Sequence, residues 1–386
     1  MKPVSHPVWL AGFRPFFTLA CLAGALLPVL WALIYTGTLP GPPASFSIIQ
    51  WHAHEMFFGF GWAVLGGFLL TATKNWVGIR GYHGGWLVFL VAAWLFERAG
   101  MWFGASWPAP LFLLSNFLFL VSVIAMLLWT LVRHRKTDTF RDNYLFVLAL
   151  PLFVAAKYLL LSPDGFQAGW ITAIALFRLS FLIMLERTLT QFMRGVFQVE
   201  ILRNPKLDMA IKLTALFLVA TALLPSSLAV AAELLLAVLL LGRFLFWKPQ
   251  LAMRRLDIGI MYLGYAALIL QLVLDVADRL ANPAWVGTVA VHVFTFGAMG
   301  LITPALMIRI SKGHTGRKVA FDAVDVNAIR IMMLAFVLRV VAPQLYPAGY
   351  STWIVLAAAC WLLCFGMLAW RLVPLLWRPR ADGKEH

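Results

Sequence analysis

Charged residues are scarce in this sequence of 386 residues. Only 12% of the chain is Asp, Glu, Lys or Arg, whereas 62% is hydrophobic. Soluble globular proteins carry about 25% charged residues, so the composition excludes that class. Apolar runs of about 18 residues or more recur along the whole chain, and this pattern predicts many membrane-spanning helices.

Cysteine is also rare, with three residues in the chain. Cys21 is isolated, and Cys360 and Cys364 lie one helical turn apart in an apolar stretch, where we expect them to pack. These positions exclude a disulfide framework. The sequence has no Cys-x-x-Cys-His motif for covalent haem attachment, and residues 1–15 lack the layout of a cleavable signal peptide.

Acidic residues are about half as frequent as basic ones, 16 against 31, which gives a formal net charge of +15. In a soluble protein this excess would suggest a nucleic-acid partner. Here the basic residues flank apolar segments, so we attribute them to membrane topology and to contact with anionic membrane lipid. We expect no nucleic-acid partner.

Turn-forming residues divide the apolar sequence into about twelve predicted spans. Because no linker or low-complexity segment interrupts the chain, we expect one all-α polytopic transmembrane bundle over residues 1–386. The predicted spans are 16–36, 54–73, 85–103, 109–131, 143–161, 168–187, 207–224, 228–246, 257–280, 285–310, 325–345 and 350–377.

Basic residues alternate from loop to loop. They follow the second, fourth, sixth, eighth and tenth predicted spans and close the chain, whereas the intervening loops carry almost none apart from Arg279. This alternation predicts an even number of spans with both termini in the cytoplasm. It also places the start of the second span on the outer face.

Two histidines and a carboxylate gather where the second span is predicted to begin. The stretch holds His52, His54, Glu55 and Met56. Such groups are costly in hydrocarbon, so a cluster of them is a candidate functional site. Histidine is a good ligand for transition metals and for haem iron. Residues two apart on a helix point about 200° apart, so either His52 folds back beside His54 from the helix end or the two serve different partners.

Four of the basic residues inside predicted spans are candidates for binding an anion. Arg98 and Lys157 fall near the outer ends of the third and fifth spans, Arg178 lies midway along the sixth, and Arg339 lies in the outer third of the eleventh. Such groups must face the protein interior and pair there. Glu97 and other acidic residues offer purely structural partners, and a bound anion is the alternative.

The tenth span carries His292 about 10 Å below its outer end. At α-helical spacing, His292 shares one stripe with Thr295, Phe296, Met299 and Thr303. The small residues at 297, 298 and 300 leave room for a neighbouring helix or for a flat ring. On the cytoplasmic side, basic and polar residues gather at 6–17 and 310–318, and we favour a helix-capping loop over an anion site there.

Several motifs together resemble the NnrS family of bacterial membrane proteins. They are His6-Pro7-Val8-Trp9-Leu10-Ala11-Gly12-Phe13-Arg14-Pro15-Phe16-Phe17, Trp51-His52-Ala53-His54-Glu55-Met56, Gly67-Phe68-Leu69-Leu70-Thr71-Ala72 with Asn75-Trp76, His292 with Gly297-Ala298-Met299-Gly300, and Gly313-His314-Thr315-Gly316-Arg317. The resemblance implies a bacterial inner-membrane protein that carries haem and copper and serves the response to nitric oxide and nitrosative stress.

This resemblance assigns chemistry to the candidate residues. We expect haem b between the second and tenth spans near the outer face, with His54 or His292 as axial ligand and with Arg98, Lys157, Arg178 or Arg339 near its propionates. We expect copper on His52, with His54 or Met56, and Glu55 as the hydrogen-bond partner of an imidazole. Two alternatives stay open, a twelve-span secondary transporter and a haem–copper enzyme that reduces nitric oxide. The oligomeric state is not predicted.

Overall fold

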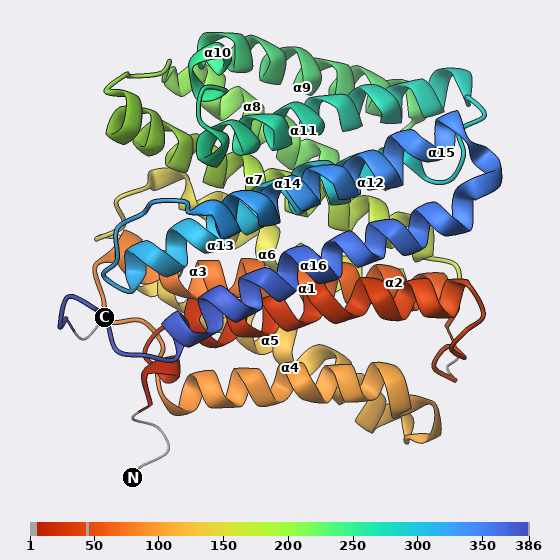
Figure 1. Ribbon diagram of the computed structural model, residues 1–386, viewed down its shortest axis with the longest axis horizontal. Coiled ribbons are helices and arrows are strands. Elements are labelled where there is room, and N and C mark those ends of the chain that lie inside the picture. The colour runs from red at the N-terminus through yellow and green to blue at the C-terminus, as the bar shows by residue number, and fades with distance from the viewer. Residues whose placement is uncertain (1–5, 44–45, 385–386) are drawn as a thin grey trace. The chain divides into compact units, whose positions relative to one another are not determined.

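A computed structural model of the chain describes residues 6–43 and 46–384, so the first five residues of the N-terminal segment lie outside it. Within these ranges all regular elements are helical (Figure 1). A segment that crosses a bilayer must satisfy its backbone hydrogen bonds internally, and an α-helix does so along its own length. The prediction of an all-α polytopic fold is confirmed.

The chain divides into two compact units. Unit 1 comprises Met1–Gly169, Met307–Ala320 and Phe365–His386, and unit 2 comprises Trp170–Leu306 and Phe321–Cys364. The helices that contribute to both units are α7 (Phe166–Phe197), α13 (Leu301–His314) and α16 (Tyr350–Leu376). The single domain expected from the sequence stays a prediction.

Unit 1 is built around α1 and α3, which pack side by side (Figure 1). A Cβ atom at Gly67 on α3 would lie 2.7 Å from the Cβ of Phe16 on α1, so glycine allows this close approach. The helices of unit 1 are Pro7–Trp9 (3₁₀), α1 (Phe13–Tyr35), α2 (Ile48–His54), the π-helix η3 (Glu55–Gly61), α3 (Trp62–Val77), α4 (Gly85–Phe103), Gly104–Ser106 (3₁₀), α5 (Ala109–Arg133), Arg141–Asn143 (3₁₀) and α6 (Tyr144–Leu161).

Unit 2 contains α9 and α11 as a closely packed pair (Figure 1). Its helices, besides those shared with unit 1, are α8 (Pro205–Phe217), the 3₁₀ helix η6 (Leu218–Leu223), α9 (Ser226–Phe246), α10 (Pro249–Ala252), α11 (Leu256–Ala281), α12 (Val289–His292), the π-helix η7 (Val293–Gly300), α14 (Ala323–Phe336), the π-helix η8 (Val337–Val341), α15 (Ala342–Leu345) and Pro347–Gly349 (3₁₀).

The second predicted span begins earlier than its apolar sequence suggests. Helices α2, η3 and α3 form one continuous span, Ile48–Val77, instead of 54–73. Ser47 caps it, because its hydroxyl accepts from the Gln50 backbone N–H while the Gln50 side chain accepts from the Ser47 N–H. His52 and His54 therefore lie inside the helix and not at its mouth.

Ten helices in the described ranges are long and apolar enough to cross a membrane. The predicted spans 207–224 and 325–345 fall outside this set, and each is divided into shorter helices. Trp247, just beyond α9, donates from its indole nitrogen to the Leu202 carbonyl, just before α8, at 2.9 Å. The start of α8 therefore lies beside the end of α9, a candidate membrane span.

The segment α14–α15 lies antiparallel to the segment that contains α12 and η7. Gln344 at its end exchanges hydrogen bonds of 3.1 and 3.0 Å with the backbone of Val286, just before α12. Further along, Met332 of α14 lies against Gly300. Residue numbers that fall along one segment as they rise along the other mark an antiparallel pair, so α14–α15 runs back along α12 and η7.

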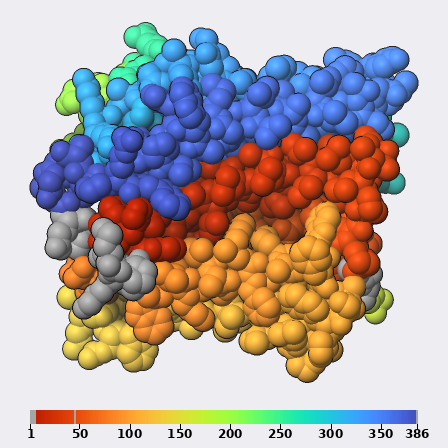
Figure 2. Space-filling model, turned by 60° about the horizontal axis from the view of Figure 1, so that its bottom comes forward, coloured from red at the N-terminus to blue at the C-terminus, as the bar shows by residue number. Residues whose placement is uncertain are grey.

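The outward surfaces of unit 1 are apolar, as expected where lipid covers a helix. Figure 2 shows α1 in red and α4 in orange on one face. Leu26 on α1 is 55% exposed and Trp86 on α4 is 59% exposed. In water such a surface would be an aggregation site, whereas in a bilayer it faces hydrocarbon.

The crossing of α8–η6 generates a topological prediction. If this segment crosses, the loop 248–255 lies on the cytoplasmic side, as its basic residues require. We expect a phosphatase–galactosidase reporter inserted after Arg255 to give the cytoplasmic signal, like one inserted at Lys136. A periplasmic signal after Arg255 would mean that α8–η6 does not cross.

Candidate functional site

Of the predicted histidine–carboxylate cluster, His54 and Glu55 are buried in unit 1 and meet Glu97 there. His54 Nδ1 lies 3.1 Å from a Glu55 carboxylate oxygen, and His54 Nε2 lies 3.3 Å from Glu97 Oε1 on α4. Arg98 donates to the same Glu97 oxygen at 2.6 Å, and the Lys157 ammonium of α6 donates to it as well. Three spans thus meet at one carboxylate.

Charge in this cluster is balanced. Glu55 and Glu97 face Arg98 and Lys157, with Arg98 Nε 3.2 Å from Glu55 and the Lys157 ammonium also donating to the Asn116 carbonyl. At this depth each unpaired ion would cost several kcal/mol, so mutual pairing explains how four ionised groups can be buried. The sequence left open whether the basic residues pair with protein carboxylates or with a bound anion, and in the structure Arg98 and Lys157 pair with Glu97.

Glycine at position 59 makes room for this network. A Cβ atom there would collide with the Arg98 guanidinium, which lies over the Trp94 ring at 5.0 Å from its centroid. Trp94 in turn donates from its indole nitrogen to the Gly59 carbonyl at 3.1 Å. The glycine after His54 therefore accommodates a protein side chain and not a cofactor ring.

His54 does not present a nitrogen to open space. Its side chain is completely buried, and Nε2 lies 3.3 Å from Glu97 Oε1 without a hydrogen bond to it. Haem iron bound to Nε2 would come close to this carboxylate. Glu55 is placed as predicted, beside an imidazole nitrogen, although the imidazole it contacts belongs to a charge network.

His52 points to a different partner, which is one of the two outcomes predicted from its spacing. Its ring stacks on the Trp31 indole, with centroids 4.1 Å apart and planes 20° apart. Met56 is half-buried in the following turn. Among the residues that the structure describes, no group of three or more His, Cys, Asp or Glu side chains is arranged to hold a metal ion.

His292, at the end of α12 in unit 2, has a different environment. Its Nδ1 lies 2.7 Å from the carbonyl oxygen of Thr288 and 3.0 Å from the Thr288 hydroxyl. A carbonyl oxygen can only accept, so Nδ1 carries the proton and Nε2 carries the lone pair. A backbone carbonyl that fixes the tautomer in this way is typical of histidines that ligate metals.

The stripe predicted from His292 at α-helical spacing is wrong in detail, because residues Val293–Gly300 form a π-helix. The small residues there pack against protein. A Cβ at Gly297 would lie 2.6 Å from the Cβ of Ala267, and one at Gly300 would lie 3.3 Å from the sulfur of Met332. The room that these glycines leave is used by α11 and α14.

The four predicted anion-binding residues separate into two classes. Arg98 and Lys157 pair with carboxylates of unit 1, and Arg339 donates to the Tyr350 hydroxyl at 3.1 Å. Arg178 is 3% exposed, and its Nε and one terminal nitrogen have no hydrogen-bond partner in the described structure. The nearest opposite charges, Asp275 and Glu233, attract it without such bonds.

Three π-helices coincide with predicted site residues. His54 immediately precedes Glu55–Gly61, His292 immediately precedes Val293–Gly300, and Arg339 lies within Val337–Val341. Such segments are rare and occur frequently at functional sites. Nothing in the 3.6-residue periodicity of the sequence indicates them.

Sequence reasoning missed a second buried charge network, in unit 2. Arg243 is fully buried and approaches Glu186 at 3.4 Å and Asp208 at 3.3 Å. Lys212 contacts Glu186 at 3.1 Å, and Arg203 at 2.7 Å. The sequence does indicate such a network, because Glu186 and Lys212 are charged residues inside predicted spans and must pair there.

The basic and polar stretches on the cytoplasmic side come together in unit 1. Arg14 donates to the carbonyls of Leu376 and Arg378, at 2.8 and 2.7 Å, and Arg380 donates to the His314 carbonyl at 2.9 Å. Arg380 also holds the pKa of the Asp382 carboxyl well below its usual range through a hydrogen bond. These contacts cap helices and tether the C-terminal segment, in line with the favoured interpretation.

Comparison with known proteins identifies one family. The family model described as NnrS protein matches residues 7–380 of the chain, which is nearly its whole length. No curated protein matches the chain.

The Lys157–Glu97 pair generates a stability prediction. Changing Lys157→Met leaves Glu97 with less compensation, which should lower the free energy of unfolding by about 3–5 kcal/mol. The double variant Glu97→Gln/Lys157→Met should recover much of this loss, because Glu55 and Arg98 still balance each other. Thermal unfolding in detergent measures both, with Lys136→Met on an exposed loop as control. Equal stability of Lys157→Met and wild type would show that the network does not hold the three spans together.

Proposed function

Because the chain belongs to the NnrS family, a family of nitric-oxide-responsive membrane proteins, we propose that it binds haem b through His292 and acts in the bacterial inner membrane. The observation that carries this proposal is the 2.7 Å contact between His292 Nδ1 and the Thr288 carbonyl. It places the proton on Nδ1, so Nε2 is the nitrogen whose lone pair would bind an iron ion. The His54 Nδ1 also has an acceptor, Glu55, but its Nε2 is buried 3.3 Å from the Glu97 carboxylate.

Arg178 supports the same assignment within unit 2. A buried guanidinium with unsatisfied N–H groups is costly, and a carboxylate is its best partner. A haem propionate supplies such a carboxylate. We propose that Arg178 binds one propionate, whereas Arg98, Lys157 and Arg339 serve the protein contacts described above.

Bound haem would supply an iron that takes nitric oxide as a ligand, and the chain's own part is to position it. His292 would hold the iron through Nε2, and the Thr288 carbonyl fixes the orientation of its ring. Since α12 precedes η7 and α13, whose far end leads into a basic loop, His292 belongs to the outer side of the membrane. The placement of haem between the second and tenth spans stays a prediction.

Copper fits the described residues less well. The His52 ring stacks on Trp31, and the His54 ring faces Glu55 and Glu97, so the predicted donors do not converge on one point. Copper binding at His52 would require its ring to leave Trp31. We derive no step through copper and make its presence a question for metal analysis.

The haem proposal is tested on the purified protein by pyridine haemochrome and absorption spectra with and without nitric oxide. We expect a Soret band that shifts with nitric oxide, and we expect His292→Ala to abolish it. Arg178→Gln should weaken haem affinity about tenfold, because a hydrogen bond to a charged group contributes about 1.5–3 kcal/mol. His314→Ala is the control and should leave the spectrum unchanged.

Two results would contradict this assignment. Loss of haem only in His54→Ala would transfer the axial ligand to unit 1. A colourless wild-type protein that takes up a substrate in vesicles would favour the transporter alternative instead.

For copper, elemental analysis of wild type and His52→Ala provides the measurement. If His52 ligates copper, the variant loses the metal, and ultraviolet emission from Trp31 changes when copper is added to the apoprotein. Equal copper content in the two proteins would exclude His52 as a ligand. Trp31→Phe, which keeps an aromatic surface for His52, is the matched control and should retain copper.

A further inference from the structure

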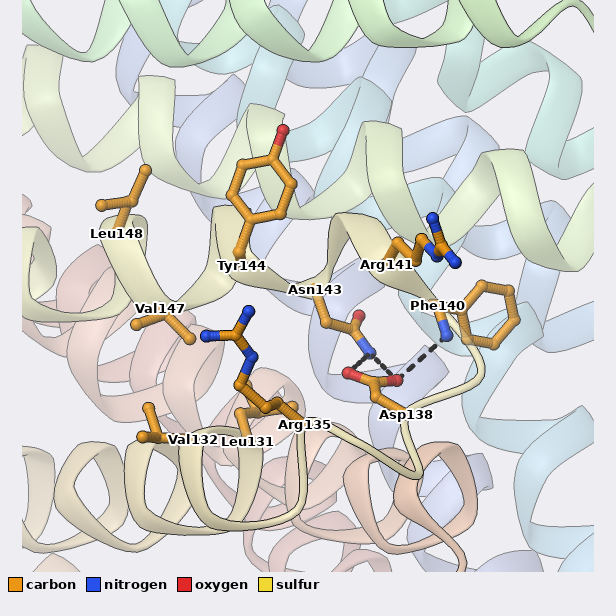
Figure 3. A pocket seen from close by; sticks show the side chains of 10 residues that line it. All are labelled: Leu131, Val132, Arg135, Asp138, Phe140, Arg141, Asn143, Tyr144, Val147 and Leu148. Carbon is orange, nitrogen blue, oxygen red and sulfur yellow. Dashed lines mark hydrogen bonds between the residues drawn. The ribbon is translucent and has the colours of Figure 1, made fainter.

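A groove of about 620 Å³ opens where α5 ends and α6 begins, in unit 1. Figure 3 shows the side chains that line it, with Arg135 and Arg141 separated by Asn143 and with apolar side chains below and beside them. Both helices belong to candidate membrane spans, Ala109–Arg133 and Arg141–Leu161, and the groove lies at the ends of the two spans. It is therefore at a membrane boundary, where lipid headgroups are the surrounding molecules.

The polar side of this groove is positively charged. Arg135 and Arg141 are both exposed, and within residues 6–43 and 46–384 neither forms an ion pair or hydrogen bond. The one carboxylate in the groove, Asp138, is already engaged. It accepts two hydrogen bonds from the Asn143 amide at 2.8 and 2.9 Å and one from the Phe140 backbone N–H at 3.0 Å. The free positive charge suits an anion.

The other side of the groove is apolar and faces outward. Val132 on α5 is 57% exposed and Leu148 on α6 is 54% exposed, and Tyr144 stands between the apolar and polar sides. Tyrosine at such a boundary places its ring in the hydrocarbon and its hydroxyl among headgroups. A ligand that carries both a phosphate and an acyl chain matches the two sides.

Asn143 adds a specific feature. Its side chain is 2% exposed, and its Oδ1 has no hydrogen-bond partner in the described structure. The orientation of the amide is fixed, because its nitrogen donates to Asp138, so the unpartnered atom must be the oxygen. A buried acceptor without a donor costs about 1–3 kcal/mol. A hydroxyl group on the ligand would satisfy it.

We propose that this groove binds an anionic phospholipid whose headgroup carries a hydroxyl, namely phosphatidylglycerol. Arg135 and Arg141 hold the phosphate, Asn143 Oδ1 accepts a hydrogen bond from a glycerol hydroxyl, and an acyl chain lies along Val132 and Leu148. The proposal is independent of haem binding, because no residue of the groove belongs to the proposed haem site.

Native mass spectrometry of the purified full-length protein tests this proposal by lipid titration. Phosphatidylglycerol is compared with phosphatidylmethanol, which has the same charge and no headgroup hydroxyl, and with zwitterionic phosphatidylcholine. We expect the order phosphatidylglycerol, phosphatidylmethanol, phosphatidylcholine from tightest to weakest. The variant Arg135→Gln/Arg141→Gln should bind phosphatidylglycerol about 25-fold more weakly, since each arginine near a lipid surface contributes about fivefold.

The matched control is Arg194→Gln/Arg254→Gln, which removes two exposed arginines far along the chain from the groove, one in the last turn of α7 and one in the loop after α10, and should change affinity less than twofold. Equal losses in the two double variants would reduce the effect to general charge attraction and overturn the site. Equal binding of phosphatidylglycerol and phosphatidylmethanol by wild type would overturn the role of Asn143 and the identity of the headgroup. The lipid comparison needs no variant, so it does not depend on whether the variants fold.

Discussion

The pairing of buried charges is the constraint on which much of this structure depends. A bilayer offers neither water nor counterions to a charge at depth, so each ionised side chain must find its partner on another helix. Glu97 does this for α2, α4 and α6 through His54, Arg98 and Lys157. Glu186 does the same for α7, α8 and α9 through Lys212 and Arg243. These contacts fix which helices are neighbours, whereas apolar side chains alone would pack against lipid nearly as well.

Arg178 does not follow this rule, because it forms no ion pair within the described ranges. The proposal that it binds a haem propionate rests on this difference. Arg98 and Arg178 each keep two buried nitrogens without hydrogen bonds, but Arg98 forms ion pairs with Glu55 and Glu97, whereas Arg178 forms none in the part of the chain that the structure describes. A folded chain tolerates such a group when the missing partner is brought by a ligand. Together with the tautomer of His292, it locates the proposed chemistry in unit 2, although the sequence drew equal attention to the histidines of unit 1.

The sequence predicts the elements of this protein better than their contacts. Hydropathy and turn residues place eight of the ten candidate spans within about four residues, but the span Ile48–Val77 starts six residues earlier and Phe166–Phe197 ends ten residues later than predicted. The pairing of Glu97 with a basic neighbour is foreseeable because an isolated charge is costly. The environment of His54 is not foreseeable, since Lys157 lies far away along the chain and no local signal joins them. Periodicity also fails at Val293–Gly300, because stripes are drawn on 3.6 residues per turn and a π-helix does not follow that spacing.

The π-helix at Glu55–Gly61 acts as a one-residue insertion in an otherwise continuous helix. In α-helical form the same stretch would need one residue fewer, and the helix before it would rotate by about 100° relative to the helix after it. His54 lies at that junction, so the extra residue sets which neighbour its ring meets. The alignment of α2 with α4 and α6 is thus encoded in chain length as well as in side-chain chemistry, and natural variation by one residue here would re-aim both histidines at once.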